Sequence, residues 1–254
     1  MKTILLTFDV EEFDLPREFG QKISEKESFE ISNLGLNNLF ELIEKDNIKA
    51  TFFTTTNFAK KFPNLIKQII AQGHEIASHG YSHSDNYLSD ISKIKLAKQE
   101  LEKITKTKIK GFRAPRFAIK NVSKLHDFGF EYDSSLHPTF IPGRYNNLNK
   151  KRNTHKVENI IEIPISTLSI FRLPIFWLAF KNSPSFYHNF FTKINFNSSD
   201  YTMLVFHPWE FTDLSEFNIP SYIKKNPIEK LKKYLLFCRK KAYNFKTIQD
   251  YLNL

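Results

Sequence analysis

The residues HEIASHGYSH, at positions 74–83, predict the end of a buried strand that carries two histidines. Apolar residues fill the strand, and Gly80 allows the chain to turn sharply away from it. His79 and His83 are four residues apart, so their imidazoles can reach the same side of a helical turn or a tight loop and bind one divalent metal. A solvated or hydrogen-bonded pair of histidines explains the same spacing equally well. The functional interpretation therefore depends on what the neighbouring strand ends carry.

Outward from this stretch, apolar strand-like segments alternate with segments that have apolar residues at helical spacing. We predict strands at 2–10, 49–56, 74–81, 109–117 and 130–135, and helices at 34–47, 62–73, 89–107 and near 121–127. Such alternation with buried parallel strands predicts either a closed barrel or a doubly wound sheet. In a barrel, active-site residues gather at the C-terminal strand ends. Asp9, His79, Arg113 and Asp133 occupy such ends.

The second half of the chain is less regular. We predict a polar loop at 137–156, a strand at 159–166, a strand at 201–211 that carries His207, and a helix at 227–243. Residues 168–191 are the most aromatic part of the chain and show no clean period. We therefore expect one domain over residues 1–254, with an irregular aromatic-rich insertion near 168–196.

Composition limits the class of protein. An apolar fraction of 41% over 254 residues is enough to bury one large core. No run of 18 apolar residues is present, and Met1 and Lys2 lead directly into a strand, so we expect a cytoplasmic protein with no signal peptide or transmembrane helix. The single cysteine, Cys238, excludes an internal disulfide. The net charge of +10 could attract polyanions or anionic lipids, but the lysines are dispersed over predicted helices, so we expect no nucleic-acid partner.

Five short motifs, in this order and at these intervals, resemble those of the polysaccharide deacetylase family, which is carbohydrate esterase family four and acts on chitooligosaccharides, peptidoglycan and surface glycans. They are TFDVEEFD (7–14), HGYSH (79–83), FRAP (112–115), YDSS (132–135) and LVFH (204–207). The resemblance spans about residues 3 to 210. It implies an α/β fold, a distorted (β/α) barrel of seven or eight strands, and hydrolysis of an N-acetyl or related acyl group on an amino sugar. It also implies one divalent metal, most often zinc, with cobalt, nickel or manganese as alternatives.

The resemblance assigns roles to individual residues. Asp9 matches the catalytic base, His79 and His83 match the two histidine ligands, Arg113 matches the arginine that orients the base, and His207 matches the general acid. Such an assignment fits amide hydrolysis, which needs an activated water, a stabilised oxyanion and a proton for the departing amine. Taken singly, each residue is better explained by structure, Asp9 as a strand cap, Arg113 as a buried ion pair and His207 as a satisfied histidine; only the five together favour function.

Three further residues complete the predicted site. Asp133 matches the fourth motif, where we expect a supporting catalytic role. Arg116 stands where the family often has a tyrosine whose backbone N–H helps to bind the oxyanion, so we expect substrate contact there. Trp209, two residues after the proposed acid, is a candidate wall around the acyl methyl group. The aromatic segment 168–191 is better explained as core or barrel lid, although Arg172, Phe176 and Trp177 could line a sugar groove.

The first motif departs from the family at the residue after the base. The family has a second, metal-binding aspartate there, but Val10 cannot bind a metal. Side chains alternate along a strand, so Glu11 shares a face with Asp9 if the extended backbone continues, whereas Glu12 falls with Val10. We therefore expect Glu11 to complete the metal site with His79 and His83.

Three hypotheses remain at this point. The first is a metal-dependent deacetylase of an N-acetylated glycan or a lipid-linked sugar, with peripheral membrane contact also compatible with the basic charge. The second is a catalytically inactive glycan-binding barrel, which the change at Val10 keeps open. The third is a polyanion binder, whose affinity would fall steeply with salt. The sequence does not determine the oligomeric state.

Overall fold

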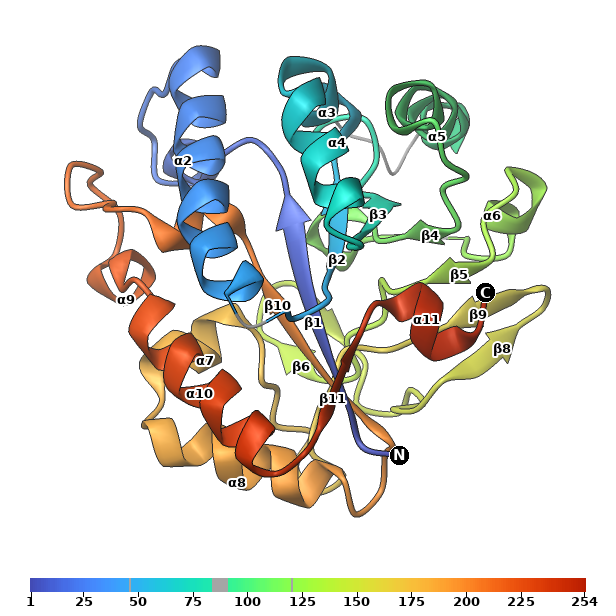
Figure 1. Cartoon of the computed structure of the whole chain (residues 1–254), viewed down its shortest axis with the longest axis vertical. Helices are drawn as coiled ribbons and strands as arrows, with labels where there is room; N and C mark the ends of the chain where they lie inside the picture. Colours follow the sequence, from blue (N-terminus) through green and yellow to red (C-terminus); the bar gives the residue numbers. More distant parts are fainter. Residues whose placement is uncertain (46, 84–90, 120) are drawn as a thin grey trace.

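The computed structural model describes residues 1–45, 47–83, 91–119 and 121–254 and has an α/β architecture. Within these residues a nine-stranded sheet curls on itself, with helices along its outer side (Figure 1). The strand order is β10-β1-β2-β3-β4-β5-β9-β8, and β11 also pairs with β1. The strands are β1 (Thr3–Val10), β2 (Thr51–Thr54), β3 (Glu75–Ser78), β4 (Gly111–Phe112), β5 (Tyr132–Asp133), β8 (His155–Val157), β9 (Ile160–Glu162), β10 (Tyr201–Phe206) and β11 (Asn244–Lys246).

All pairings in this sheet are parallel except that between β8 and β9. The sheet curls until β10 approaches the segment that follows β9. There the Tyr201 hydroxyl donates to the Pro164 carbonyl at 2.6 Å, and the Met203 N–H donates to Ser166 Oγ at 2.8 Å. Side-chain hydrogen bonds thus bridge this seam, and the predicted distorted (β/α) barrel is confirmed.

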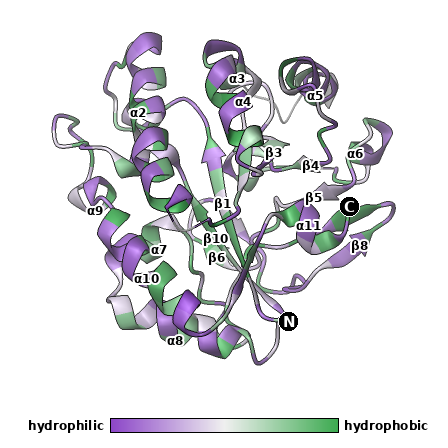
Figure 2. Ribbon diagram, in the orientation of Figure 1, coloured by the Kyte–Doolittle hydropathy of each residue, from purple (hydrophilic) through white to green (hydrophobic). Residues whose placement is uncertain are grey.

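Helices cover the outer side of the sheet, and hydrophilic residues are frequent on outer helices such as α2 and α10 (Figure 2). The α-helices are α1 (Leu15–Glu18), α2 (Glu25–Glu44), α3 (Thr56–Lys61), α4 (Pro63–Ala71), α5 (Ile91–Thr105), α6 (Lys124–Asp127), α7 (Trp177–Asn182), α8 (Ser185–Asn195), α9 (Ser221–Lys224), α10 (Ile228–Lys240) and α11 (Ile248–Leu252). Two 3-10 helices follow strand ends, η2 (Pro115–Phe117) and η3 (Pro208–Phe211). No helix among the described residues is long and apolar enough to cross a membrane.

Alternation along β1 separates two hydrophobic clusters. Ile4, Leu6 and Phe8 pack in the larger cluster between the sheet and the helices, whereas Leu5 packs in the smaller cluster inside the barrel. Asp9 lies on the same side of the strand as Leu5, since side chains repeat with a period of two. The sequence therefore places the Asp9 carboxylate inside the barrel, at its C-terminal rim.

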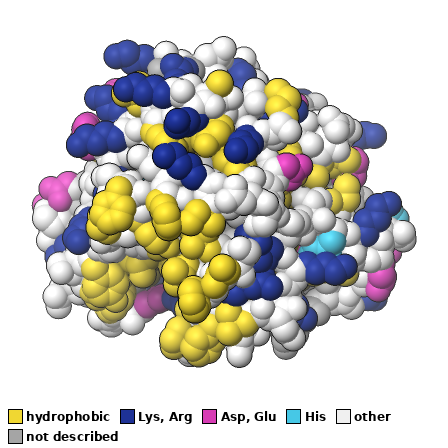
Figure 3. All heavy atoms as spheres, turned by 90° about the horizontal axis from the view of Figure 1, so that it is seen from below, with side chains coloured by type: hydrophobic (Ala, Val, Ile, Leu, Met, Phe, Trp, Pro, Cys, Tyr) yellow, Lys and Arg dark blue, Asp and Glu magenta, His cyan; other side chains and the backbone are white. Residues whose placement is uncertain are grey.

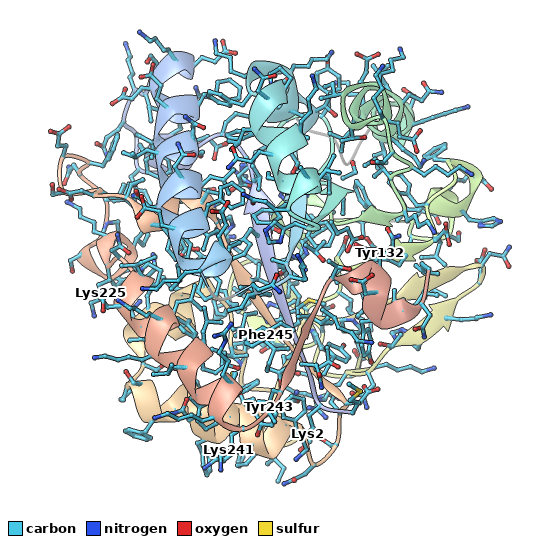
Figure 4. All side chains as sticks on the ribbon, in the orientation of Figure 1. Lys2, Tyr132, Lys225, Lys241, Tyr243 and Phe245 are labelled. Atoms are coloured by element: carbon cyan, nitrogen blue, oxygen red, sulfur yellow. The ribbon has the colours of Figure 1, made fainter. Side chains whose placement is uncertain are left out.

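The other end of the barrel is tied by the last helix. Glu75 at the start of β3 accepts hydrogen bonds from the Tyr132 hydroxyl at 2.7 Å and from the backbone N–H of Gln249 in α11 at 3.0 Å. Figure 4 shows Tyr132 beside α11. These contacts anchor the chain end beneath the strands that carry the site.

Several sequence expectations need correction. The helix expected at 34–47 begins at Glu25, because Ser24 caps it by accepting the N–H of Glu27. Residues 137–156 contain a hairpin of β6 (Phe140–Ile141) and β7 (Tyr145–Asn146) and the start of β8, rather than loop alone. The segment near 168–196 contains α7 and α8, so it is not irregular throughout. Residues 89 and 90 of the helix expected at 89–107 lie outside the described residues.

Candidate active site

The predicted site residues meet at the C-terminal ends of neighbouring strands. Asp9 and Glu11 come from the end of β1 and the residue after it, His79 and His83 follow β3, and His207 follows β10. These five line one pocket of ≈ 1100 Å³ of empty volume, including open solvent at its mouth. The order of strands in the sheet thus brings together residues that are up to 198 positions apart.

Arg113 holds Asp9 in place. The Arg113 guanidinium is fully buried and donates to Asp9 Oδ1 at 2.7 Å and to Thr7 Oγ1 at 2.9 Å, while its other nitrogens donate to Ser134. Burial by itself raises the pKa of Asp9, but the positive charges of Arg113, His79 and His207, with the hydrogen bond from Arg113, together outweigh it and hold the pKa below its usual range. Asp9 is therefore an ionised carboxylate with a fixed orientation.

Glu11 contacts both histidines of the HGYSH motif. Its Oε2 atom lies 3.1 Å from His79 Nε2 and 3.4 Å from His83 Nε2. The second ring nitrogen of each histidine is also engaged, with His79 Nδ1 2.9 Å from the carbonyl of Arg113 and His83 Nδ1 3.0 Å from Asp14 Oδ1. This pattern, with Nδ1 held by an oxygen and Nε2 directed to a common point, is typical of metal-binding histidines.

The hydrogen-bonding roles of Glu11 and His79 indicate whether a cation can bind between them. A carbonyl oxygen only accepts, so His79 Nδ1 must carry the proton that it shares with Arg113. His79 Nε2 then faces an ionised carboxylate, which also only accepts, and the contact is favourable only with a proton or a metal ion between them. No group of three or more His, Cys, Asp or Glu in the described ranges is already arranged as a metal cage. The donor set nevertheless fits a metal that replaces these hydrogen bonds.

The pKa values of Glu11 and Glu12 are shifted in opposite directions. Burial raises the pKa of Glu11, but the neighbouring histidines, His83 first, outweigh it and hold the pKa below the usual range. Burial raises the pKa of Glu12, whose Oε2 instead accepts from Thr55 Oγ1 at 3.3 Å and from the backbone N–H of His83 at 3.4 Å. Glu12 therefore braces the turn that carries His83, and Glu11 is the carboxylate directed at both rings.

His207 follows the end of β10, next to Asp9 at the end of the neighbouring β1, and is held by a residue that sequence reasoning missed. Glu210 Oε1 lies 3.1 Å from His207 Nδ1 and accepts the His207 backbone N–H at 2.8 Å. The fully buried Lys181 of α7 lies 3.0 Å from the other oxygen of Glu210. Burial lowers the pKa of His207, but the carboxylates of Glu11 and Glu210 outweigh it and raise the pKa above its usual value.

Two of the missed residues have recognisable signals in the sequence. Asp14 lies inside the TFDVEEFD motif, and Glu210 lies three residues after His207, within reach of the N-terminal turn that begins there. Lys181 had no such signal, because only the docking of α7 against η3 brings it to Glu210.

The predicted substrate residues take different positions. Trp209 is buried and stacks on His207 with 4.8 Å between ring centroids, and Trp177 contacts the same imidazole edge-on at 5.4 Å. Both line the pocket, as does Phe176. Arg116 has a left-handed backbone, with φ of 56°, and its half-exposed guanidinium pairs with Glu18 at 2.9 Å on the pocket wall.

Asp133 is not among the residues that line the pocket. It is fully buried and accepts from Ser135 Oγ at 2.6 Å, and Ser135 Oγ in turn accepts the Ala114 N–H at 2.8 Å. Burial raises the pKa of Asp133. Glu162 is its hydrogen-bonded partner, and burial together with the charge of Asp133 raises the pKa of Glu162 as well. Asp133 thus supports the strand end that carries Arg113 and does not contact the pocket residues described above.

Comparison with known proteins shows similarity to polysaccharide deacetylases in sequence and in fold. A peptidoglycan deacetylase of Helicobacter pylori is 33% identical over 117 residues, which are 43% of this chain and 40% of that protein. A solved structure from Mycobacterium smegmatis covers 98% of this chain with a TM-score of 0.66 at 18% identity, over 88% of its own chain. A CE4 family pseudoenzyme from Bacillus anthracis also covers 98% of this chain, with a TM-score of 0.56 at 14% identity, over 64% of its own chain.

The chain spans well under two thirds of the length of the curated relatives that it matches. Their descriptions therefore do not transfer as a whole. The sequence profile of the polysaccharide deacetylases, however, matches residues 1–132, which contain the two-histidine motif and Arg113. That match covers more than half of the chain, and the chain belongs to the polysaccharide deacetylase family.

Proposed function

We propose that this protein is a metal-dependent hydrolase that removes an N-acetyl or related acyl group from an amino sugar of a glycan. The observation that carries the proposal is the convergence, in one pocket, of an ionised Asp9 held by Arg113, a Glu11–His79–His83 set, and His207 held by Glu210. Amide hydrolysis needs these three components on one substrate group.

Each component has a distinct task in the proposed reaction. Glu11, His79 and His83 would hold the metal, which when bound lowers the pKa of water from about 15.7 to about 7 and polarises the acyl carbonyl. Asp9 accepts the proton of the attacking water, and Arg113 keeps this carboxylate ionised and oriented. His207 donates a proton to the departing amine, and Glu210 keeps the imidazole directed into the pocket. The indoles of Trp177 and Trp209 shield this proton transfer from bulk water.

The pocket is compatible with an extended substrate. A second cavity of ≈ 1030 Å³ shares Glu18, Arg116 and Arg144 with the pocket, and it continues past Tyr145 to Asn147. We propose an N-acetylated glycan or a lipid-linked sugar as the substrate, with Arg116 and Arg144 available for anionic or polar groups.

The decisive experiment incubates metal-loaded protein with a panel of N-acetylated oligosaccharides, nucleotide sugars and lipid-linked sugars and measures released acetate. We expect release from at least one glycan, reduced roughly 10²–10⁴-fold by Asp9→Asn or His207→Ala, with metal content unchanged in both variants. Release that persists in either variant removes that residue from the mechanism.

The metal ligands are tested separately. Metal content of Glu11→Ala and Glu12→Ala distinguishes the two acids, because only Glu11 contacts both histidine rings. We expect Glu11→Ala to lose metal and activity, and Glu12→Ala to retain the metal. The reverse result would reassign the carboxylate ligand to Glu12.

A second function, a glycan-binding protein without catalysis, is favoured by two observations. Val10 replaces the usual metal-binding aspartate, and a CE4 family pseudoenzyme shares the fold. Glycan binding without acetate release by metal-loaded protein would select this function. Acetate release that Glu11→Ala abolishes would exclude it.

A further inference from the structure

One face of the molecule exposes an unusual concentration of large hydrophobic side chains. Of the 13 exposed large hydrophobic residues in the described chain, seven lie between positions 140 and 190. Phe171 is 84% exposed, Phe186 is 73% exposed and Ile170 is 67% exposed. We call this set the hydrophobic face; its members are Phe140, Leu148, Ile170, Phe171, Leu173, Phe186 and Phe190.

Contacts between three segments bring this face together. Thr139, beside Phe140 in the β6 hairpin, donates from its hydroxyl to the Arg172 carbonyl at 2.8 Å. The Tyr187 hydroxyl of α8 lies 3.4 Å from the carbonyl of Pro174, on the other side of the same 167–174 turn. Figure 3, which views the molecule from the side where α8 lies in Figure 1, shows a continuous area of hydrophobic side chains with Lys and Arg beside it.

The charge of these segments is uniformly positive. Residues 134–157 and 163–199 contain no Asp or Glu, although the whole chain has 27 acidic residues. Besides the fully buried Lys181, the two segments carry seven basic residues, namely Arg144, Lys150, Lys151, Arg152, Lys156, Arg172 and Lys193. Arg152 donates from Nε to the Thr167 carbonyl and from its guanidinium to Asn195 Oδ1 of α8. These hydrogen bonds hold the preceding residues, the exposed Lys150 and Lys151, close to the hydrophobic face.

The hydrophobic face also adjoins the pocket. Phe140 precedes Ile141, and Leu173 is three residues before Phe176; Ile141 and Phe176 both line the pocket. The segments that expose apolar side chains outward therefore form pocket wall on their other side.

We propose that the hydrophobic face docks the protein on the surface of an anionic lipid bilayer. Exposed aromatic and aliphatic side chains enter the boundary between headgroups and acyl chains, while the neighbouring lysines and arginines contact anionic headgroups. Excluding acids from two segments of 24 and 37 residues removes the charges that an anionic surface would repel. Docking in this way brings the pocket wall next to the bilayer, where a lipid-linked sugar would be presented; that last step rests on the proposed function, whereas docking itself does not.

Vesicle co-sedimentation tests the docking without any measurement of activity. We expect the wild-type protein to sediment with vesicles of phosphatidylcholine mixed with phosphatidylglycerol, and to bind phosphatidylcholine vesicles at least about tenfold more weakly. The double variant Phe171→Ser/Phe186→Ser should lower binding to the mixed vesicles about tenfold or more, and Lys150→Gln/Lys151→Gln should lower it roughly thirtyfold. All four side chains are on the surface, so we expect an unchanged melting temperature for both variants.

Leu236→Ser is the matched control, because Leu236 is 55% exposed on α10, outside the hydrophobic face. It should bind the mixed vesicles as the wild type does. Absence of wild-type binding to the mixed vesicles, or an equal loss in Leu236→Ser, would overturn the proposal. A homodimer that Phe171→Ser/Phe186→Ser dissociates, in protein that does not bind vesicles, would instead identify the face as an interface between two copies. Acetate release from a soluble glycan reports on the proposed function independently of each result.

Discussion

Glu210→Gln is the substitution that most directly tests how His207 is tuned. The Glu210 carboxylate is fully buried, lies 3.1 Å from His207 Nδ1 and accepts the backbone N–H of the same residue. Glutamine keeps an acceptor oxygen for both contacts but removes the negative charge. A hydrogen bond to a charged group contributes about 1.5–3 kcal/mol, so we expect kcat/KM near neutral pH to fall roughly ten- to a hundredfold.

The pH dependence of kcat/KM separates this electrostatic role from packing. His207 must be protonated to act as an acid, so activity is lost as the pH rises through its pKa. Burial lowers that pKa, and the Glu11 and Glu210 carboxylates raise it to a net value above normal. Removing the Glu210 charge should lower the pKa, so the alkaline limb of the profile should move to lower pH and the deficit should be smallest at acidic pH.

Two controls accompany this measurement. Glu216→Gln removes an exposed carboxylate from the same part of the chain and should leave the profile unchanged. Glu210→Asp keeps the charge and should restore the position of the alkaline limb, even if the shorter side chain reduces the rate. An alkaline limb that stays in place in Glu210→Gln would refute the reasoning and leave Glu210 with a packing role.

Further predictions concern stability. Lys181→Met should destabilise the protein by about 3–5 kcal/mol, because it removes the lysine that pairs with the buried Glu210 carboxylate. Lys181→Met/Glu210→Gln should recover most of the lost melting temperature. A double variant as unstable as the single one would contradict this explanation. Burial raises the pKa of Glu162, and of its partner Asp133, in the folded protein. The folded state therefore keeps its protons to higher pH than the unfolded state, so the contribution of each carboxyl group to stability is present below pH ~4 and is lost as the pH rises. The loss is at most about 1.4 kcal/mol per pH unit for each group. Glu162→Gln should flatten this dependence in urea unfolding between acidic and neutral pH, and an unchanged slope would exclude it. Gly35→Ala places a Cβ 1.9 Å from the Pro208 carbonyl oxygen, so we expect a loss of about 1–3 kcal/mol by overpacking, measurable by thermal unfolding; a variant as stable as the wild type would show that α2 can move away from η3.

The sequence predicted which segments of the first half form strands, because each is an apolar run between clear helical segments. β1 was expected at 2–10 and is Thr3–Val10, but the strand expected at 109–117 was wrong in extent, because only Gly111–Phe112 pair as β4 and η2 follows. Strand alternation also placed Glu11 correctly beside the histidines, even though β1 ends one residue earlier. The local sequence pattern was sufficient to place a side chain whose position depends only on its strand and on the side of that strand to which it points.

Local pattern failed where tertiary contacts decide the structure. Aromatic side chains occupy both the buried and the exposed sides of α8, where Phe191 is buried and Phe186 and Phe190 are exposed, so its buried face is hard to recognise in the sequence. The position of Asp133 outside the pocket lining could not be read from its motif either, since its partner Glu162 lies 29 residues later on β9. The roles of the site residues in catalysis stay predictions until the variants are measured.

The position of β1 has a consequence for how the protein is made. Along its first three residues, β1 pairs with β11, and along most of its length it also pairs with β10. Thr3 thus acquires these strand partners only when Tyr201 and Asn244 have been synthesised. Until then the first half of β1, which includes Ile4, Leu5 and Leu6, has no strand partner on either edge. Exposed apolar strand edges of this kind promote aggregation, against which chaperones protect a nascent chain. His207 arrives with the same late segment, so a nascent chain that already contains Asp9 and both motif histidines still lacks its proposed proton donor.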